Sequence, residues 1–200
     1  MICYPPKSKA KIKTKPRSRN QGNHSMANTV LIGIDPGLSG AIASIAVAED
    51  GSSVVRVTDM PTKQSRTGNK RSIDAWEFEQ ALYSHCRDKA SVAIEHVGGI
   101  PGQSAPAAFE FGFGAGIIEG VLSAIGYSRV YVRPQTWRKE MNVIGSGKDA
   151  VMHTLQQYAP DAYGAWILRK GHDGRADAIM IACWLAKNNG IQLRNIGSVM

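Results

Sequence analysis

Apolar positions form short runs before residue 60 and alternate between helical and strand-like spacing after it. The short runs are separated by turn signals such as Pro36-Gly37 and Asp50-Gly51, which predicts a meander of three strands at 29–35, 40–48 and 53–59. A polar loop is expected at 61–72. Later periodicity predicts strands at 91–96 and 129–133, a short helix from Pro134, and helices at 74–87, 105–125, 148–158 and 174–188. This order is typical of a mixed sheet with helices on both faces.

Charge divides the chain into a basic extension and a nearly neutral body. The net charge is +8, and residues 1–28 hold seven Lys or Arg and no acid. The rest of the chain is nearly neutral, because it holds the other 17 of the 24 basic residues and all 16 acidic residues. We expect a disordered extension over 1–28, one folded domain over 29–192 and a C-terminal tail over 193–200. The extension has no apolar segment typical of a secretory signal. It is a nucleic-acid-binding arm, an organelle-targeting segment, or a dispensable stretch before a start at Met26.

Cysteine and apolar content exclude some classes of protein. The three cysteines are isolated and odd in number, so they support neither a disulfide framework nor a zinc cluster and favour a reducing compartment. The longest apolar stretch, 105–126, contains Glu110, Glu119 and five glycines, which makes it a poor membrane span. We therefore expect no transmembrane helix and no membrane partner.

Three carboxylates lie at the boundaries of apolar runs. Asp35 closes the run 30–34, Glu95 closes 92–94, and Asp177 opens 178–186. An ionised carboxylate at the edge of a core is unfavourable unless a cation compensates its charge. Acids from three distant segments that each end a buried element therefore predict a site for divalent metal ions.

Segments around these acids resemble a known family. The blocks 32–40 (IGIDPGLSG), 94–95 (IE) and 172–178 (HDGRADA) resemble the catalytic blocks of RuvC-type Holliday junction resolvases, in the same order. The resemblance covers about residues 29 to 190. Phage and prophage members are similar also in Met60-Pro61, Pro101-Gly102-Gln103 and Pro134-Gln135-x-Trp137.

The resemblance implies an RNase H-like fold, with a five-stranded mixed sheet flanked by helices and the acidic cluster at its centre. It implies that Asp35 bridges two Mg²⁺ ions, with Glu95 and Asp177 as further ligands and Mn²⁺ as a substitute. The implied activity is resolution of four-way DNA junctions by paired symmetric nicks, performed by a homodimer without a nucleotide cofactor. The implied location is the cytoplasm of a bacterial cell or of a phage-infected host.

The identity of a fourth ligand stays open between two neighbours. Asp173 and Asp177 are four residues apart, so they share one helix face, where a bound cation would remove their repulsion. Asp173 is also suited to cap the N-terminus of the final helix. Some resolvases use His and others Asp at this point. We expect Asp173 to be the ligand and His172 to orient water or phosphate nearby.

Basic and polar residues around the blocks are candidates for DNA contacts. Lys148 matches a lysine that resolvases use near the active site, although a solvated residue at a helix start is the plain alternative. A nucleotide-binding P-loop is excluded because Asn142 and Asp149 replace residues that it requires. Gln103 and Ile100 occupy the loop where the family places a residue that wedges into the junction. Further candidates for phosphate contact are Arg138, Lys139, Arg175, Lys63, Arg66, Lys70 and Arg71.

Two other readings of the chain remain. A less selective RNase H-like nuclease would act on branched DNA or RNA–DNA hybrids, and a non-catalytic nucleic-acid-binding protein would not need the intact acidic set. Phe109, Phe111 and Phe113 cannot share one helix face. We expect them to be core residues rather than surfaces for base stacking.

Overall fold

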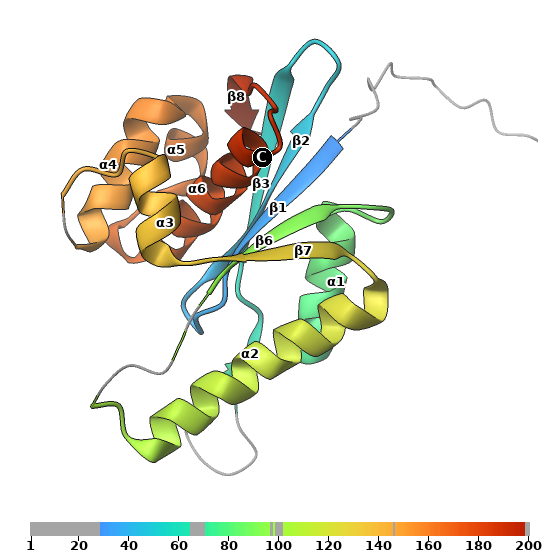
Figure 1. Ribbon diagram of the computed structural model, residues 1–200, viewed down its shortest axis with the longest axis vertical. Helices are drawn as coiled ribbons and strands as arrows, with labels where there is room; N and C mark the ends of the chain where they lie inside the picture. Colours follow the sequence, from blue (N-terminus) through green and yellow to red (C-terminus); the bar gives the residue numbers. More distant parts are fainter. Residues whose placement is uncertain (1–28, 65–70, 97, 99–101, 146, 199–200) are drawn as a thin grey trace, which may run out of the picture.

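The computed structural model describes residues 29–64, 71–96, 98, 102–145 and 147–198, so the expected disorder of 1–28 lies outside it. Its centre is a six-stranded mixed sheet (Figure 1). The first three strands form the expected antiparallel meander, and the remaining three each pair with a neighbour in parallel. In order across the sheet the strands are β7 (Ser128–Val132), β6 (Ser91–Glu95), β1 (Thr29–Asp35), β2 (Ala41–Val47), β3 (Ser52–Asp59) and β8 (Arg194–Ser198).

Helices cover both faces of this sheet and enclose two cores (Figure 1). The larger core lies under α3 (Pro134–Glu140), α4 (Lys148–Tyr158), α5 (Pro160–Trp166) and α6 (Asp173–Asn188), with the 3-10 turn Lys170–His172 before α6. The smaller core lies under α1 (Ala75–His85) and α2 (Ala105–Ile125). The expected mixed sheet between two helical layers is confirmed.

The central strand β1 supplies side chains to both cores. Leu31 packs with α6 in the larger core, whereas Ile32 and Ile34 pack with α1 and α2 in the smaller one. Gly33 lets α6 lie directly on the strand, because a Cβ there would stand 2.2 Å from the carbonyl oxygen of Ala178. This contact holds the start of α6 close to the end of β1.

Several short elements were not expected from the sequence. The segment 61–72, expected as a loop, contains the hairpin strands β4 (Thr62–Gln64) and β5 (Arg71–Ile73). Helix α5 follows α4 almost directly. Residues 193–200, expected as a tail, include β8, which extends the sheet beyond β3 and makes it six-stranded rather than five-stranded.

Helix α2 exposes most of its apolar surface. Only Gly114, Ile118 and Leu122 are buried, whereas Phe109 is 70% and Phe113 is 52% exposed, so the expectation that these two are core residues is wrong. Among the described residues, α2 is the one helix with the length and hydropathy of a membrane span. Only the length and the composition of α2 support a membrane-spanning role.

Candidate active site

The carboxyl ends of β1 and β6 bring two of the predicted acids to one edge of the sheet. The two strands run parallel and pair Ile34 with Ile94, so Asp35 and Glu95 follow as the next neighbours across the sheet. The ends of adjacent parallel strands are a common place for binding sites.

The N-terminus of α6 brings two more acids to the same edge. Gly174 permits this approach, because a Cβ there would stand 2.4 Å from the carbonyl oxygen of Ser39 and 3.0 Å from Oδ2 of Asp35. Asp173 and Asp177 lie in the first turns of this helix. The structure therefore gathers carboxylates from β1, β6 and α6, as the sequence predicted.

Burial and neighbouring charges raise the pKa values of two of these carboxylates. Burial raises the pKa of Asp35 to about 6; the charges of Glu95 and Asp173 add to the rise, and the N–H of Gly37, 3.1 Å from Oδ1, opposes it. Burial also raises the pKa of Asp177 to about 7, with Asp35 as the largest charge contribution. The cluster holds more negative than positive charge, and a divalent cation would favour the ionised forms.

Helix α3 holds two of the acids in place. Nε1 of Trp137 donates a hydrogen bond of 2.8 Å to Oε1 of Glu95. Nη2 of Arg138 lies 3.8 Å from Oδ1 of Asp177, and its guanidinium lies over the Trp137 ring at 5.3 Å. Arg138, expected as a phosphate contact, here balances part of the negative charge. Trp137 was not identified as a site residue, although the motif Pro134-Gln135-x-Trp137 contains it.

The acids are not arranged as a complete metal-coordination site in this structure. Within the described ranges, no three His, Cys, Asp or Glu side chains stand in an arrangement that would hold an ion without movement. Two of the acids are in contact with Trp137 and Arg138 instead. The donor chemistry still fits, because carboxylate oxygens are the ligands that Mg²⁺ prefers and the charge of the cluster is largely uncompensated. Binding would require the carboxylates to rotate toward a common centre.

His172 faces a different set of partners. Its buried ring accepts a hydrogen bond of 2.9 Å from Nε of Arg169 at Nε2, and its Nδ1 lies 3.2 Å from the carbonyl oxygen of Trp166. Burial lowers the pKa of His172, and the charges of Arg175 and Arg169 lower it further. Asp173, by contrast, acts directly on the pKa of Asp35. The structure thus brings Asp173, and not His172, into the acidic cluster.

Arg175 joins α6 to β3. Its guanidinium pairs with Asp59 through two contacts of 2.6 and 2.8 Å and donates to the carbonyl oxygen of Trp166 at 3.2 Å. This pairing lowers the pKa of Asp59. Arg175 is thus engaged with Asp59 and Trp166, and its expected phosphate contact stays a prediction.

The remaining predicted DNA contacts lie on several elements. Lys139 is exposed on α3, and Gln103 is half-buried before α2. Arg71 donates a 2.8 Å hydrogen bond to the carbonyl oxygen of Leu38 and so ties β5 to the turn after Asp35. Lys148 begins α4. The candidates Lys70, Arg66 and Ile100 lie outside the described residues, so their roles stay predictions.

Comparison with known proteins gives a clear result only at the level of structure. No family model matches the sequence, and no curated protein is a significant match. RuvC from Thermus thermophilus in complex with a Holliday junction substrate is similar over 82% of this chain and 99% of its own, with 17% sequence identity and a TM-score of 0.51. The yeast mitochondrial Holliday junction resolvase Ydc2 is similar over 85% of this chain and 84% of its own, with 14% identity and a TM-score of 0.52. The chain therefore has the fold of the RuvC-type resolvases.

Proposed function

We propose that this protein is a metal-dependent, structure-selective endonuclease that resolves Holliday junctions by paired symmetric nicks. The observation that carries the proposal is the cluster of Asp35, Glu95, Asp173 and Asp177 at one edge of the sheet, where burial and neighbouring carboxylates raise the pKa values of Asp35 and Asp177. The substrate is inferred from the shared fold, since one similar structure holds a Holliday junction and the other is a resolvase.

The four acids would hold the metal ions in the proposed reaction. Asp35, whose Oδ1 accepts a hydrogen bond from the N–H of Gly37, would be a ligand together with Glu95, Asp173 and Asp177. Mg²⁺ held there would supply an activated water and stabilise the charge on the leaving oxygen. Trp137 orients Glu95, and Arg138 partly neutralises Asp177 until metal and DNA arrive. Because burial raises the pKa values of Asp35 and Asp177 to about 6 and about 7, metal binding near these pH values would release protons.

The test compares substrates and acid variants. Labelled four-way junction, linear duplex and RNA–DNA hybrid are incubated with and without Mg²⁺. We expect Mg²⁺-dependent cleavage of the junction, abolished in Asp35→Asn, Glu95→Gln and Asp177→Asn while junction binding persists, because these changes remove metal charge and leave the DNA contacts. Asp161→Asn, at an exposed position in α5, is the matched control and should cleave normally.

Other outcomes separate the alternatives. Preferred cleavage of the hybrid or of linear duplex would support the less selective nuclease. Binding without cleavage under any metal would support the non-catalytic reading. Near wild-type cleavage by one of the three acid variants would remove that acid from the ligand set.

We further propose that the protein acts as a homodimer through the exposed face of α2. The rings of Phe109 and Phe113 stack at 6.2 Å on this face. Gly112, Gly116 and Gly120 follow at four-residue spacing, and a Cβ at any of them would meet nothing within 4 Å. Small residues at this spacing let a second helix approach closely, and two symmetric nicks require two sites in one assembly.

Light scattering tests this interface. The wild-type protein should have the mass of a dimer, and Phe109→Glu with Phe113→Glu should give a monomer that binds the junction but no longer makes paired nicks. Leu168→Glu, which is also at a strongly exposed apolar position, should remain dimeric. A monomeric wild type that floats with lipid vesicles would instead assign α2 to a membrane.

A further inference from the structure

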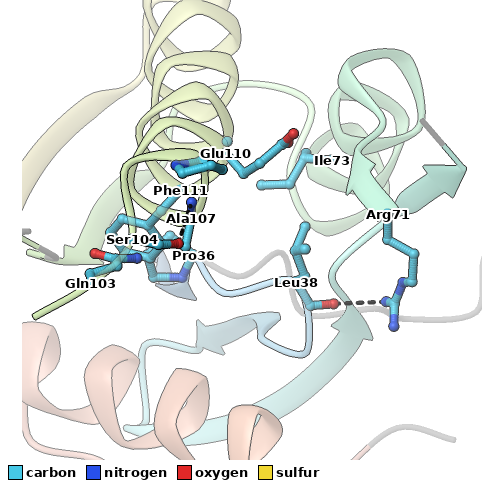
Figure 2. Close-up of a pocket in the computed structure, with 11 residues that line it drawn as sticks. Pro36, Leu38, Arg71, Ile73, Gln103, Ser104, Ala107, Glu110 and Phe111 are labelled. Atoms are coloured by element: carbon cyan, nitrogen blue, oxygen red, sulfur yellow. Dashed lines mark hydrogen bonds between the residues drawn. The ribbon is translucent and has the colours of Figure 1, made fainter. Parts of the chain in front are cut away.

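A mostly apolar pocket of about 430 Å³ lies between the β1–β2 turn, β5 and the first half of α2 (Figure 2). Leu38 and Ile73 form one side, and Phe111 lies across from them on α2. The volume is within the range of pockets that hold small ligands. Phe111 is half-buried here, unlike its exposed neighbours Phe109 and Phe113.

Polar groups stand at the ends of the pocket. Gln103 lies at one end and Arg71 at the other (Figure 2). The Gln103 amide offers both a donor and an acceptor. Arg71 uses Nη2 to bond the carbonyl oxygen of Leu38 and uses Nε and Nη2 to bond Thr62, which fixes the hairpin against the turn. The pocket therefore combines aliphatic and aromatic walls with the polar side chains of Gln103, Arg71, Ser104 and Glu110.

The pocket adjoins the acidic site through Pro36. Pro36, which follows Asp35, lines this pocket and also lines a smaller cavity of about 120 Å³ together with Glu95 and His96. A DNA strand whose phosphate lies at the acids would thus have a neighbouring nucleotide at the mouth of the pocket.

We propose that this pocket receives one unstacked nucleobase of the cleaved strand, next to the scissile phosphate. The inference rests on the proposed junction endonuclease function and adds a basis for choosing the position of the cut. A nucleobase has two apolar faces and a hydrogen-bonding edge, which match the walls and the ends of the pocket. Unstacking is least unfavourable where pairing is already disturbed, as at a branch point.

The experiment uses junctions that carry 2-aminopurine at single positions around the cut. Its fluorescence rises when the base leaves the stack, and metal-free buffer prevents cleavage. We expect a several-fold rise at one position with wild-type protein and none with Leu38→Trp, whose larger side chain fills the pocket. Val54→Trp is the matched control: Val54 is also 39% exposed but lies in β3, away from the pocket, and should behave as wild type.

A second variant tests whether Gln103 forms hydrogen bonds to the edge of the base, and it leaves the pocket open. Gln103→Ala should keep the fluorescence rise but reduce the preference for one base at that position, by up to about 100-fold if a two-bond contact is lost. Both variants should still bind the junction, since phosphate contacts supply most of the affinity.

The outcomes distinguish this inference from the function on which it rests. An equal rise with Leu38→Trp, or no rise at any position with wild-type protein, overturns the base pocket even if Mg²⁺-dependent junction cleavage is intact. Absence of junction cleavage by the wild-type protein overturns the proposed function itself.

Discussion

Asp35 and Asp177 hold their protons more tightly in the folded protein than in the unfolded chain. Burial and neighbouring carboxylates raise their pKa values from 3.8 to about 6 and about 7. A raised carboxyl pKa adds stability at low pH, and this contribution is lost as pH rises from about 4 to 7. His85, whose pKa burial lowers to about 4, acts in the opposite direction over the same range.

Replacing one acid isolates this effect. Relative to Asp177→Asn, which keeps His85 unchanged, the metal-free wild-type protein should lose on the order of 2–4 kcal/mol of unfolding free energy between pH 4 and 7. Mg²⁺ at pH 7 should restore the wild type and leave the variant unaffected. Denaturant unfolding at several pH values measures both curves; parallel curves would contradict the raised pKa of Asp177.

The choice between Asp173 and His172 is also a question about single residues. Asp173→Asn should reduce cleavage by orders of magnitude, with partial rescue by Mn²⁺, because the charge of Asp173 acts on Asp35. His172→Ala should have a milder effect, since the ring packs against residues 166–169. Single-turnover cleavage rates measure the ranking, and the reverse order would assign the fourth ligand to His172.

Site residues could be predicted from the sequence where a charged side chain lies at the boundary of a buried apolar run. Asp35, Glu95 and Asp177 were predicted from their positions at the ends of apolar runs, and the structure brings them together. The partners of Arg138 and Arg175 could not be predicted, because pairing with Asp177 and Asp59 depends on tertiary contacts between distant segments. The residues around an arginine in the sequence do not show whether its guanidinium pairs with a phosphate or with a carboxylate.

Among the elements, α6 sets the geometry of the site by lying against the β1–β2 turn. Gly174 leaves no room for a side chain, because a Cβ would stand 2.7 Å from the Cα of Gly40 as well as close to Ser39 and Asp35. Backbone atoms on both sides of this contact cannot move away without displacing the helix or the turn.

Gly174→Ala should therefore displace the start of α6. We expect a loss of roughly 1–3 kcal/mol in unfolding free energy, typical of an overpacked core, and a larger proportional loss of cleavage. Gly164→Ala, in α5 with open space around the Cβ, is the matched control and should be neutral or slightly stabilising. Wild-type stability and activity in Gly174→Ala would show that the helix does not need this close approach.

Element prediction failed where the segments are short or lack a hydrophobic period. Strands β4 and β5 have three residues each and are mostly polar, so their pairing leaves no pattern to detect. The β8 strand adds to an edge by pairing with β3, which depends on the tertiary structure. The aromatic residues of α2 were assigned to a core because the sequence does not show which face of the helix meets the sheet.

At the scale of the whole molecule, most of the net positive charge and the candidate catalytic acids occupy different parts of the chain. The acids lie in the folded domain, whereas the seven basic residues of the extension precede it. Contacts between basic side chains and phosphates carry affinity but little recognition of shape.

A protein that begins at Met26 should fold and cleave junctions as the full chain does, and its affinity for DNA of every shape should fall together. If the arm binds fully, the slope of log K against log salt should decrease by up to about six units, or about 0.9 for each phosphate contact. Affinities for junction and duplex at several salt concentrations measure this. An unchanged slope would favour a targeting segment or a later start, and a loss confined to junctions would mean that the arm recognises branching.

The placement of β1 between two cores makes the site depend on the whole domain. Leu31 belongs to one core and Ile32 to the other, and the strand ends in Asp35. Unfolding of either core would disturb β1, which also packs in the other core. The domain should consequently unfold as one cooperative unit, and partly folded forms should lack the assembled acidic site and, with it, the proposed nuclease activity.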